Sequence, residues 1–373
     1  MRLLDRYVLT KFTVPFLYCF IGFISIWLVF DLSDNGPDFI EAKIPMVRVL
    51  HYYGTQVPEI IVISLPIAEL LALLYALTQM SRSNEIVSML TAGVGVIRIL
   101  APLFIVGFIL TGVTMYFNYS LAPHAPAEKK EMIREMRVGK KGEKGLTGHL
   151  FRNRENLRTW YMRKIHQSKQ ELEDVEIIQQ DKDGNITDQW YAHQGEYDPI
   201  TKRWFFYDTK YVHLNEAGEM TDPVYERKII IPGWTETPWR ISSSVLNPDF
   251  LSVPELEEYL YYNSDFPPRR LAAYRTQLQN RWALPWVCLV SILLAGPLGI
   301  VYTRRGILGG VSGAIGAFFG LVFISSLFVT LGKGSYINPW VAAWGPLGAF
   351  FILGVILTWM KSTNRELPKI PGL

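Results

Sequence analysis

The sequence predicts an α-helical membrane protein with six transmembrane helices and an all-β domain, a sandwich or barrel, inserted between the third and fourth spans. Six apolar segments reach the length that a bilayer requires, whereas most ionisable residues lie in the middle of the chain. In that middle part, short runs of β-forming residues alternate with turn sequences. Charged residues make up 19% of the 373 residues, below the roughly 25% of soluble domains.

The predicted spans follow from bilayer thickness, since a hydrocarbon core of about 30 Å needs about 20 helical residues. They cover residues 12–30, 57–78, 96–117, 282–301, 307–331 and 340–360. The second is the least apolar, because it contains Glu59, Pro66 and Glu69. We expect three parts: a transmembrane half over residues 1–120, a β-rich domain over 121–270 and a second transmembrane half over 271–373.

The basic residues of the short loops predict the orientation, because such residues are retained in the cytoplasm. They are Arg2, Arg6, Lys11, Arg82, Arg98, Arg304, Arg305, Lys361, Arg365 and Lys369. Both termini are therefore expected in the cytoplasm of an inner-membrane protein, with the middle domain on the non-cytoplasmic side. A basic stretch over residues 129–144 opposes this topology, so the inverted topology remains the alternative.

The middle domain is predicted to be a β-sandwich or barrel, reached through a polar helix over residues 127–138 and left through a helix over 254–262. Predicted strands cover residues 159–165, 174–179, 204–212 and 227–231. The domain is rich in aromatic residues such as Trp160, Trp204 and Trp234. These form either an ordinary core or an apolar groove for a lipid chain, and the sequence leaves both open.

The sequence contains no recognisable catalytic or metal-binding pattern. Gly332-Lys333-Gly334-Ser335 lacks the first glycine of a phosphate-binding loop, and neither a zinc-protease nor a nucleophile-elbow motif occurs. The six histidines are scattered, and Cys19 and Cys288 both lie in apolar runs. We therefore predict a protein that is not an enzyme and that holds no metal or cofactor of its own.

The loop over residues 81–98 predicts a short amphipathic helix on the cytoplasmic face. Ser83 or Asn84 can cap it, Glu85 falls in its first turn, and Gly93 can end it. Such a helix suits the docking of a soluble ATPase. The alternative is a helix that rests on the membrane surface without a partner.

Two features inside the membrane are candidates for substrate handling. Glu69 lies mid-span, where a carboxylate is costly and usually faces a cavity or a partner. The fifth span has a stripe of small residues that permits close helix approach, either within the bundle or as a gate that opens. Its glycines include Gly309, Gly313, Gly316 and Gly320. Arg275 and Arg281 precede the fourth span, where they either anchor the helix at the interface or bind lipid phosphates.

The order of these elements resembles the LptF/LptG (YjgP/YjgQ) permease family of the lipopolysaccharide export ABC transporter. The similarity spans nearly the whole chain and is weakest over residues 140–245. The stretches that carry it are Leu4-Asp5-Arg6-Tyr7, residues 64–66, 82–86, 92–93 and 246–251, Leu284-Pro285, residues 296–299 and residues 339–344.

The resemblance implies a permease subunit that extracts lipopolysaccharide and is driven by a separate cytoplasmic ATPase dimer, which binds the ATP. It implies a jellyroll-like periplasmic domain in a bacterial inner-membrane protein, a paralogous permease partner and a periplasmic bridge protein of similar β-jellyroll domains. Arg82, Glu85 and Gly93 would belong to the ATPase-coupling region. The first and fifth spans would form lateral gates, and basic residues at the outer half of the cavity would hold lipid phosphates.

One departure from the family concerns those phosphates. Some members carry a lysine near the outer end of the first span, but here this region is acidic, with Asp31 and Asp34. Lys43, Arg275 or Arg281 would have to serve instead. The alternative to a transporter is a membrane scaffold that displays a β-domain for envelope assembly. Glu69, the fifth-span glycines and the coupling loop favour the transporter, because a passive anchor requires none of them.

Overall fold

The computed structural model describes residues 3–41, 43–138, 146–166, 171–215, 219–243, 247–264, 266–300 and 306–363. The chain divides into two compact units, and each is described by itself. The helical unit comprises Met1–Arg137, Pro248–Glu257 and Pro268–Leu373. The β-rich unit comprises Val138–Asn247 and Glu258–Pro267.

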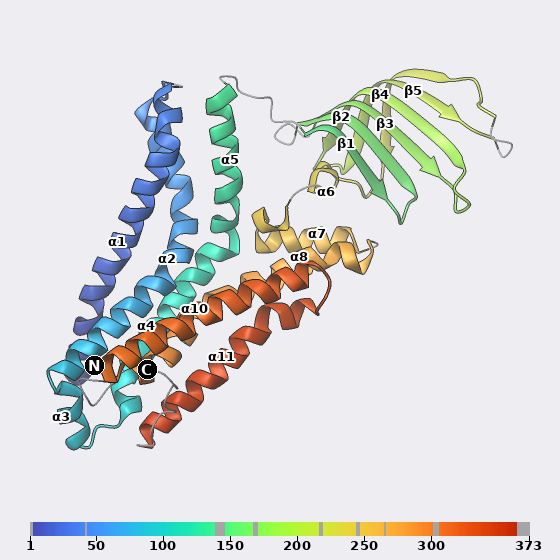
Figure 1. Ribbon diagram of the computed structural model, residues 1–373. Helices are drawn as coiled ribbons and strands as arrows, with labels where there is room; N and C mark the ends of the chain where they lie inside the picture. Colours follow the sequence, from blue (N-terminus) through green and yellow to red (C-terminus); the bar gives the residue numbers. More distant parts are fainter. Residues whose placement is uncertain are drawn as a thin grey trace. The chain divides into compact units, whose positions relative to one another are not determined.

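Within the described residues, six helical segments are long and apolar enough to cross a bilayer, which confirms the predicted spans. Figure 1 shows the long helices of this unit. The helices are α1 (Leu3–Glu41), α2 (Met46–Arg82), α4 (Val96–Tyr116), α5 (Ala122–Val138), α8 (Pro268–Ala283), α9 (Val287–Gly299), α10 (Gly306–Lys333) and α11 (Pro339–Ser362). A π-helical turn (Phe117–Leu121) joins α4 to α5, and a 3-10 turn, η3 (Leu284–Trp286), joins α8 to α9.

Several helices extend well beyond the predicted apolar segments. The 39 residues of α1, at about 1.5 Å per residue, give a length of about 58 Å, nearly twice a bilayer core. The predicted first span ended at residue 30, because the remaining turns contain Asp31, Asp34 and Asp38. The helix nevertheless continues, since a cluster around Asp31 and Asn35 packs those turns against α2.

The spans differ strongly in how much of their apolar surface the chain itself covers. In the most apolar window of each span, 67% of the residues are buried for α2 and 61% for the segment containing α9. The corresponding shares are only 6% for α1 and 17% for α10. The α2 and α9 helices therefore form the centre of the unit, whereas α1 and α10 leave most of their apolar surface uncovered.

The β-rich unit contains one antiparallel sheet in which each strand pairs with its neighbours in sequence. This confirms an all-β insertion between the third and fourth spans, and Figure 1 shows it as a curved sheet. The strands are β1 (Leu146–Asn153), β2 (Arg158–His166), β3 (Glu171–Gln180), β4 (Ile186–Asp198), β5 (Arg203–His213) and β6 (Val224–Pro232). The sequence analysis identified four of these strands and missed β1 and β4.

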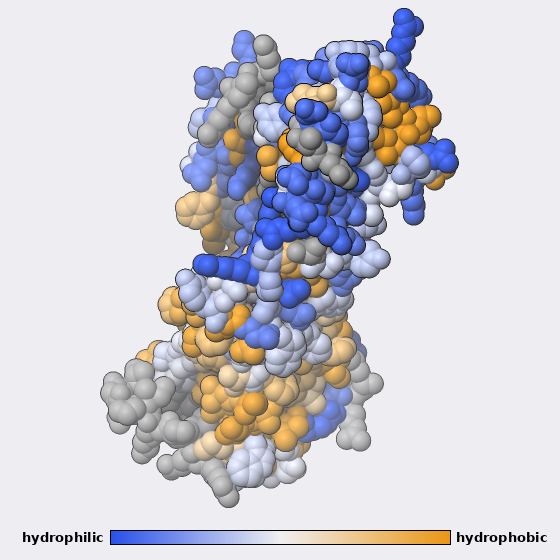
Figure 2. All heavy atoms as spheres, turned by 90° about the vertical axis from the view of Figure 1, so that its right-hand side faces the viewer, coloured by the Kyte–Doolittle hydropathy of each residue, from blue (hydrophilic) through white to orange (hydrophobic). Residues whose placement is uncertain are grey.

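Short helices complete the chain. They are α3 (Glu85–Thr91), α6 (Pro238–Ser243), the 3-10 turn η2 (Pro248–Phe250) and α7 (Val253–Tyr262). The α7 helix is the return helix that the sequence predicted over residues 254–262. Figure 2 shows hydrophobic side chains over the visible surface of the long helices and mainly hydrophilic ones over the β-rich unit.

Candidate functional site

The loop between the second and third spans contains the predicted short helix. The α2 helix ends at Arg82, which is exposed, and α3 begins at Glu85. Asn84 occupies the capping position in a left-handed conformation, with φ of 56°, and its side chain makes no capping bond. Gly93 has φ of 84° and its N–H donates to the Leu90 carbonyl, so the expected glycine ends the helix.

The α3 helix is packed firmly on one side. Ile86 is fully buried in the main hydrophobic cluster of the helical unit. This cluster includes Val8 and Phe12 of α1 and Leu77 of α2, and Met89 of α3 packs against it. Ser88 and Thr91 are exposed. The helix is therefore amphipathic, with its apolar side fixed to the ends of the spans and its polar side open.

Two polar contacts join α1 to the segment from α3 to the start of α4. The Tyr7 hydroxyl donates a hydrogen bond of 2.8 Å to Oε2 of Glu85. Asp5 forms an ion pair of 2.7 Å with Arg98 in the first turn of α4. The first two turns of α1 are thus joined both to the start of α3 and to the helix that follows it.

Grooves lie on both sides of α2. A groove of about 730 Å³ between α1 and α2 is lined by residues that include Lys11, Tyr18 and Tyr75. A second, of about 370 Å³, lies between α2 and α10, and Leu71, Tyr75 and Gln79 line both. A third, of about 360 Å³, is mostly apolar and is formed by α2, α10 and the segment from α8 to α9. The face of α2 marked by Leu71, Tyr75 and Gln79 is called the central face below.

A polar network lies where α8, η2 and α10 meet. Nη1 of Arg281 donates to Oδ1 of Asn118 at 3.0 Å, and Nη2 donates to the Asp249 carbonyl at 2.5 Å. The Asn118 amide in turn donates to the Arg281 carbonyl at 2.6 Å. Lys333, in the last turn of α10, forms an ion pair with the Asp249 carboxylate. The network therefore links the end of α10 to the segment before α7.

The inner face of the sheet is an aromatic cluster. The indole rings of Trp160 and Trp204 have centroids 5.2 Å apart, and Phe206 stacks on Trp204 at 5.6 Å. The ring of Trp234 meets Trp160 edge to face at 5.2 Å. Trp160, Trp204 and Phe206 are fully buried, so these rings form a packed core.

A buried ion pair closes one end of this cluster. Nη1 of Arg158 lies 3.0 Å from Oε2 of Glu236, whose side chain is fully buried. Asn153 donates a further bond of 2.8 Å to Glu236, and the Arg158 guanidinium lies 3.9 Å from the Trp234 ring centroid. Burial lowers the pKa of Arg158, and Glu236 opposes this effect by favouring the charged form.

The outer face of the sheet shows a regular interruption. In each strand, one residue is skipped, with no partner in the pairing with the neighbouring strands, and these unpaired positions lie side by side across the sheet. Three of them, Gly148, Asp174 and Asp208, have positive φ. The skipped residues are Gly148, Arg163, Asp174, His193, Asp208 and Arg227. This set is called the interruption row. Buried positions are three residues apart across it, as at Phe206 and Thr209.

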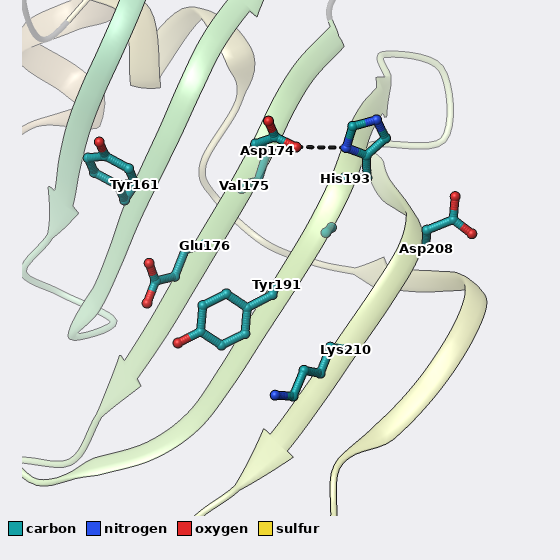
Figure 3. Close-up of a pocket in the computed structure, with 9 residues that line it drawn as sticks. Tyr161, Asp174, Val175, Glu176, Tyr191, His193, Asp208 and Lys210 are labelled. Atoms are coloured by element: carbon teal, nitrogen blue, oxygen red, sulfur yellow. Dashed lines mark hydrogen bonds and ion pairs between the residues drawn. The ribbon is translucent and has the colours of Figure 1, made fainter.

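A shallow pocket of about 430 Å³ overlies this row, with Asp174, His193 and Asp208 among its lining residues (Figure 3). Nδ1 of His193 lies 2.7 Å from Oδ1 of Asp174, and Arg163 also pairs with Asp174 at 2.6 Å. The hydrogen bond with His193 lowers the pKa of the Asp174 carboxyl. Among the residues that the structure describes, no group of three or more acidic, histidine or cysteine side chains is placed to hold a metal ion.

The sequence profile of the lipopolysaccharide export system permease LptF/LptG matches residues 6–360, which include all of the β-rich unit and nearly all of the helical unit. The chain belongs to the LptF/LptG family. No curated protein matches the sequence. Members of the family are permease subunits for lipopolysaccharide export and are not enzymes, so the chain is a multi-pass membrane protein of this class.

The basic residues expected to bind phosphate lie in different settings in this LptF/LptG permease. Lys43 is exposed in the turn between α1 and α2, and Arg275 is exposed on α8. Arg281 instead belongs to the network with Asn118 and Asp249. In the C-terminal part of α1, Asp31 forms an ion pair with Lys129 and also accepts a hydrogen bond from Tyr52.

Glu69 is fully buried among α2, α4 and α9 of the permease. The Ser291 hydroxyl lies 3.5 Å from its Oε2, and a Cβ at Gly107 would lie 3.2 Å from its Oε1. None of the three grooves described above is lined by Glu69. Its surroundings are therefore the packed interior of the helical unit.

Two of the predicted gate glycines of α10, Gly309 and Gly316, border open space. No described atom comes within 4 Å of a Cβ built at Gly309 or Gly316, and at Gly320 the nearest is a ring atom of Phe350 at 3.8 Å. Gly313 is half-buried. The face of α10 that packs within the permease instead carries Ala314, Phe318 and Leu321.

Sequence reasoning missed Tyr7, Asp5 and Asp249 as members of these contacts. Tyr7 and Asp5 belong to the stretch Leu4-Asp5-Arg6-Tyr7, and Asp249 belongs to the stretch over residues 246–251, both of which carry the family resemblance. The resemblance marked these positions, but their partners are 78 and 84 residues away for Tyr7 and Asp249, beyond any local pattern.

Proposed function

We propose that this chain is the membrane subunit of an ABC transporter that extracts lipopolysaccharide from the inner membrane and passes it to a periplasmic bridge. It works beside a paralogous permease subunit. A separate cytoplasmic ATPase dimer binds ATP and drives the pair, so the chain itself needs no cofactor. These roles extend the family's activity to this chain.

The observation that supports this proposal most directly is the contrast in burial among the spans. Only 6% of the apolar window of α1 and 17% of that of α10 is buried, and grooves lie between each of these helices and α2. Two helices that flank a groove and leave most of their apolar surface uncovered suit a lateral gate. The open space beside Gly309 and Gly316 allows a helix of the paralogous subunit to approach α10 closely.

The basic short loops support an orientation in which both termini and α3 lie in the cytoplasm. There, Arg82, Glu85 and the polar side of α3 form the surface on which the ATPase docks, and Gly93 fixes where the helix ends. In the same topology the β-rich unit is periplasmic and continues the path of the lipid through a bridge of similar domains.

Lipid phosphates are proposed to bind the exposed basic side chains of Lys43 and Arg275. Arg281 acts together with them by fixing the segment around Asp249, which it contacts through the carbonyl. Glu69 is buried in the packed centre, where we propose that it influences how α2, α4 and α9 pack together and not that it contacts the lipid. Acyl chains occupy the grooves beside the central face of α2.

The test is the variant Glu85→Arg in the complete transporter, with Glu257→Arg as the matched control. Glu257 is an exposed carboxylate on α7, in the helical unit but far from α3 in sequence. We expect Glu85→Arg to abolish co-purification of the ATPase and ATP-dependent release of lipopolysaccharide from proteoliposomes, and the control to preserve both. If the Glu85→Arg complex keeps its ATPase and exports normally, the docking assignment is wrong and the scaffold alternative gains support.

A further inference from the structure

The N-terminal stretch Leu4-Asp5-Arg6-Tyr7 carries part of the family resemblance but has no role in the function proposed so far. It forms the first turns of α1. Leu4 packs against the main hydrophobic cluster of the helical unit, whereas Asp5 and Tyr7 make polar contacts with residues far along the sequence. Residues 4–7 therefore contact the region of α3 and the start of α4 through both apolar packing and polar bonds.

The contact between Tyr7 and Glu85 is specific in its atoms. The phenolic O–H donates to Oε2 of Glu85 at 2.8 Å, so it is a hydrogen bond to an ionised acceptor, which is stronger than one between neutral groups. Among the described residues, Oε1 of Glu85 has no hydrogen-bond donor and remains open for an external partner. Lys11, one turn further along α1, lies 5.5 Å from the centre of the Tyr7 ring.

The ion pair between Asp5 and Arg98 forms the second attachment. The Asp5 side chain is 16% exposed and that of Arg98 is 37% exposed, so the pair is partly shielded from water. Arg98 lies in the first turn of α4, just after the loop that contains α3. The start of α3 and the start of α4 are therefore both joined to the first two turns of α1.

Apolar packing completes the connection. Val8 and Phe12 of α1 and Ile86 of α3 are almost fully buried in one cluster. A displacement of α3 that left α1 in place would expose these side chains and break the hydrogen bond between Tyr7 and Glu85. Only 6% of the apolar window of α1 is buried, although the helix also packs against α2 around Asp31 and Asn35.

We propose that Tyr7 and Asp5 are positioning residues that transmit movement of α3 to the gate helix α1. A conformational change of the ATPase that shifts Glu85 also displaces the first turns of α1, because the Tyr7 hydroxyl is bonded to Glu85. The Asp5–Arg98 ion pair holds the end of the loop, at the start of α4, against α1 during this movement. This inference rests on the proposed function, since it requires an ATPase at α3 and a gate at α1.

The experiment uses the complete transporter in proteoliposomes that contain lipopolysaccharide, and measures ATPase association, ATP hydrolysis and lipid released per ATP hydrolysed. Tyr7→Phe removes only the hydroxyl. We expect association and hydrolysis close to those of the native complex, with lipid released per ATP lower by about tenfold, as the loss of a hydrogen bond to a charged group allows. Tyr336→Phe is the matched control, because no described group bonds the Tyr336 hydroxyl.

The ion pair is tested by charge exchange. Asp5→Arg alone should also lower lipid released per ATP, and addition of Arg98→Asp should restore most of it. A Tyr7→Phe transporter with native lipid release per ATP would overturn the inference, as would one that loses its ATPase. If Glu85→Arg abolishes ATPase association while Tyr7→Phe exports normally, only this inference fails. If Glu85→Arg keeps its ATPase, the proposed function fails first.

Discussion

Gly354 of α11 lies directly against Leu293 of α9. A Cβ built at Gly354 would be 2.8 Å from the Cβ of Leu293 and 3.1 Å from its carbonyl carbon. One turn further on, the Thr358 hydroxyl is 3.5 Å from the Leu293 carbonyl oxygen. Part of this contact is backbone, which cannot rotate away, so the two helices approach closely only because position 354 has no side chain.

The first prediction is that Gly354→Ala destabilises the helical unit by about 1–3 kcal/mol, as overpacking of a filled interior does. The measurement is the thermal unfolding temperature of the detergent-solubilised chain. Gly348→Ala on the same helix is the control, because no described atom lies within 4 Å of a Cβ there. Equal unfolding temperatures for the two variants would contradict the close approach of α9 and α11.

The second prediction concerns the buried pair of Arg158 and Glu236. Glu236→Gln leaves the guanidinium buried without a counter-charge, and we expect a loss of about 3–5 kcal/mol in the unfolding free energy. Tryptophan fluorescence can report it, since Trp234 lies against Arg158. The joint replacement Arg158→Met with Glu236→Leu should recover much of this loss, because it removes both charges.

The control for this pair is Arg163→Gln. Arg163 is 55% exposed and pairs with Asp174 and Glu173 on the outer face, so its replacement should change stability by about 1 kcal/mol or less. If Glu236→Gln lowered the unfolding free energy no more than Arg163→Gln does, the burial of the Arg158–Glu236 pair would not explain its contribution to stability.

The third prediction addresses backbone strain in the interruption row. Asp208 has φ of 51°, a region that glycine enters freely and β-branched residues avoid. We expect Asp208→Gly to leave the stability of the β-rich unit nearly unchanged and Asp208→Val to lower it by about 1–2 kcal/mol. Denaturant unfolding followed by fluorescence measures both. Asp222→Val provides the comparison, because Asp222 is exposed and is not among the positive-φ residues.

The fourth prediction is a pH dependence due to Glu255 of α7. Burial disfavours its charged form, but hydrogen bonds from His124 and Ser252 outweigh this effect and lower the pKa of Glu255 from 4.5 to about 2. A carboxyl with a depressed folded pKa stabilises the protein above its unfolded pKa and loses this contribution as pH falls through the folded one. Glu255 should therefore contribute fully above about pH 5 and progressively less down to pH 2.

The unfolding temperatures of the native chain and of Glu255→Gln, compared from pH 7 to pH 3, measure this effect. The difference between them should shrink as the pH falls. Glu257→Gln on the same helix, at an exposed position, should show a constant small difference. A gap between native chain and Glu255→Gln that grew toward low pH would have the wrong sign and would exclude this account.

The sequence predicted the spans well, because the length of an apolar run is a local property that the bilayer selects directly. It underestimated α1, whose turns beyond residue 30 are polar and depend on contacts of Asp31 with Tyr52 and Lys129. It missed β4 because the alternation of inward and outward residues breaks at His193. Gly195 weakened the pattern further, and it is tolerated because the Phe206 ring covers it.

The candidate site was predictable only in part. The chemistry of Glu85 and Gly93 follows from helix capping, so the short helix and its end could be placed from local residues. The hydrogen bond from Tyr7 to Glu85 and the network around Arg281 join residues that are 78 and 163 positions apart. No local periodicity encodes such pairs, and the three-dimensional fold alone brings them together.

The interruption row has a practical consequence for comparing related sequences. Every strand of the sheet carries one surplus residue at the same level, so strict alternation holds within each half of a strand but not across it. An alignment that treats a strand as one unbroken repeat would assign interior residues of one half to the solvent side. Inward and outward positions should therefore be assigned separately in the two halves, with each strand divided at its skipped residue, such as Arg163, Asp174, His193 or Asp208.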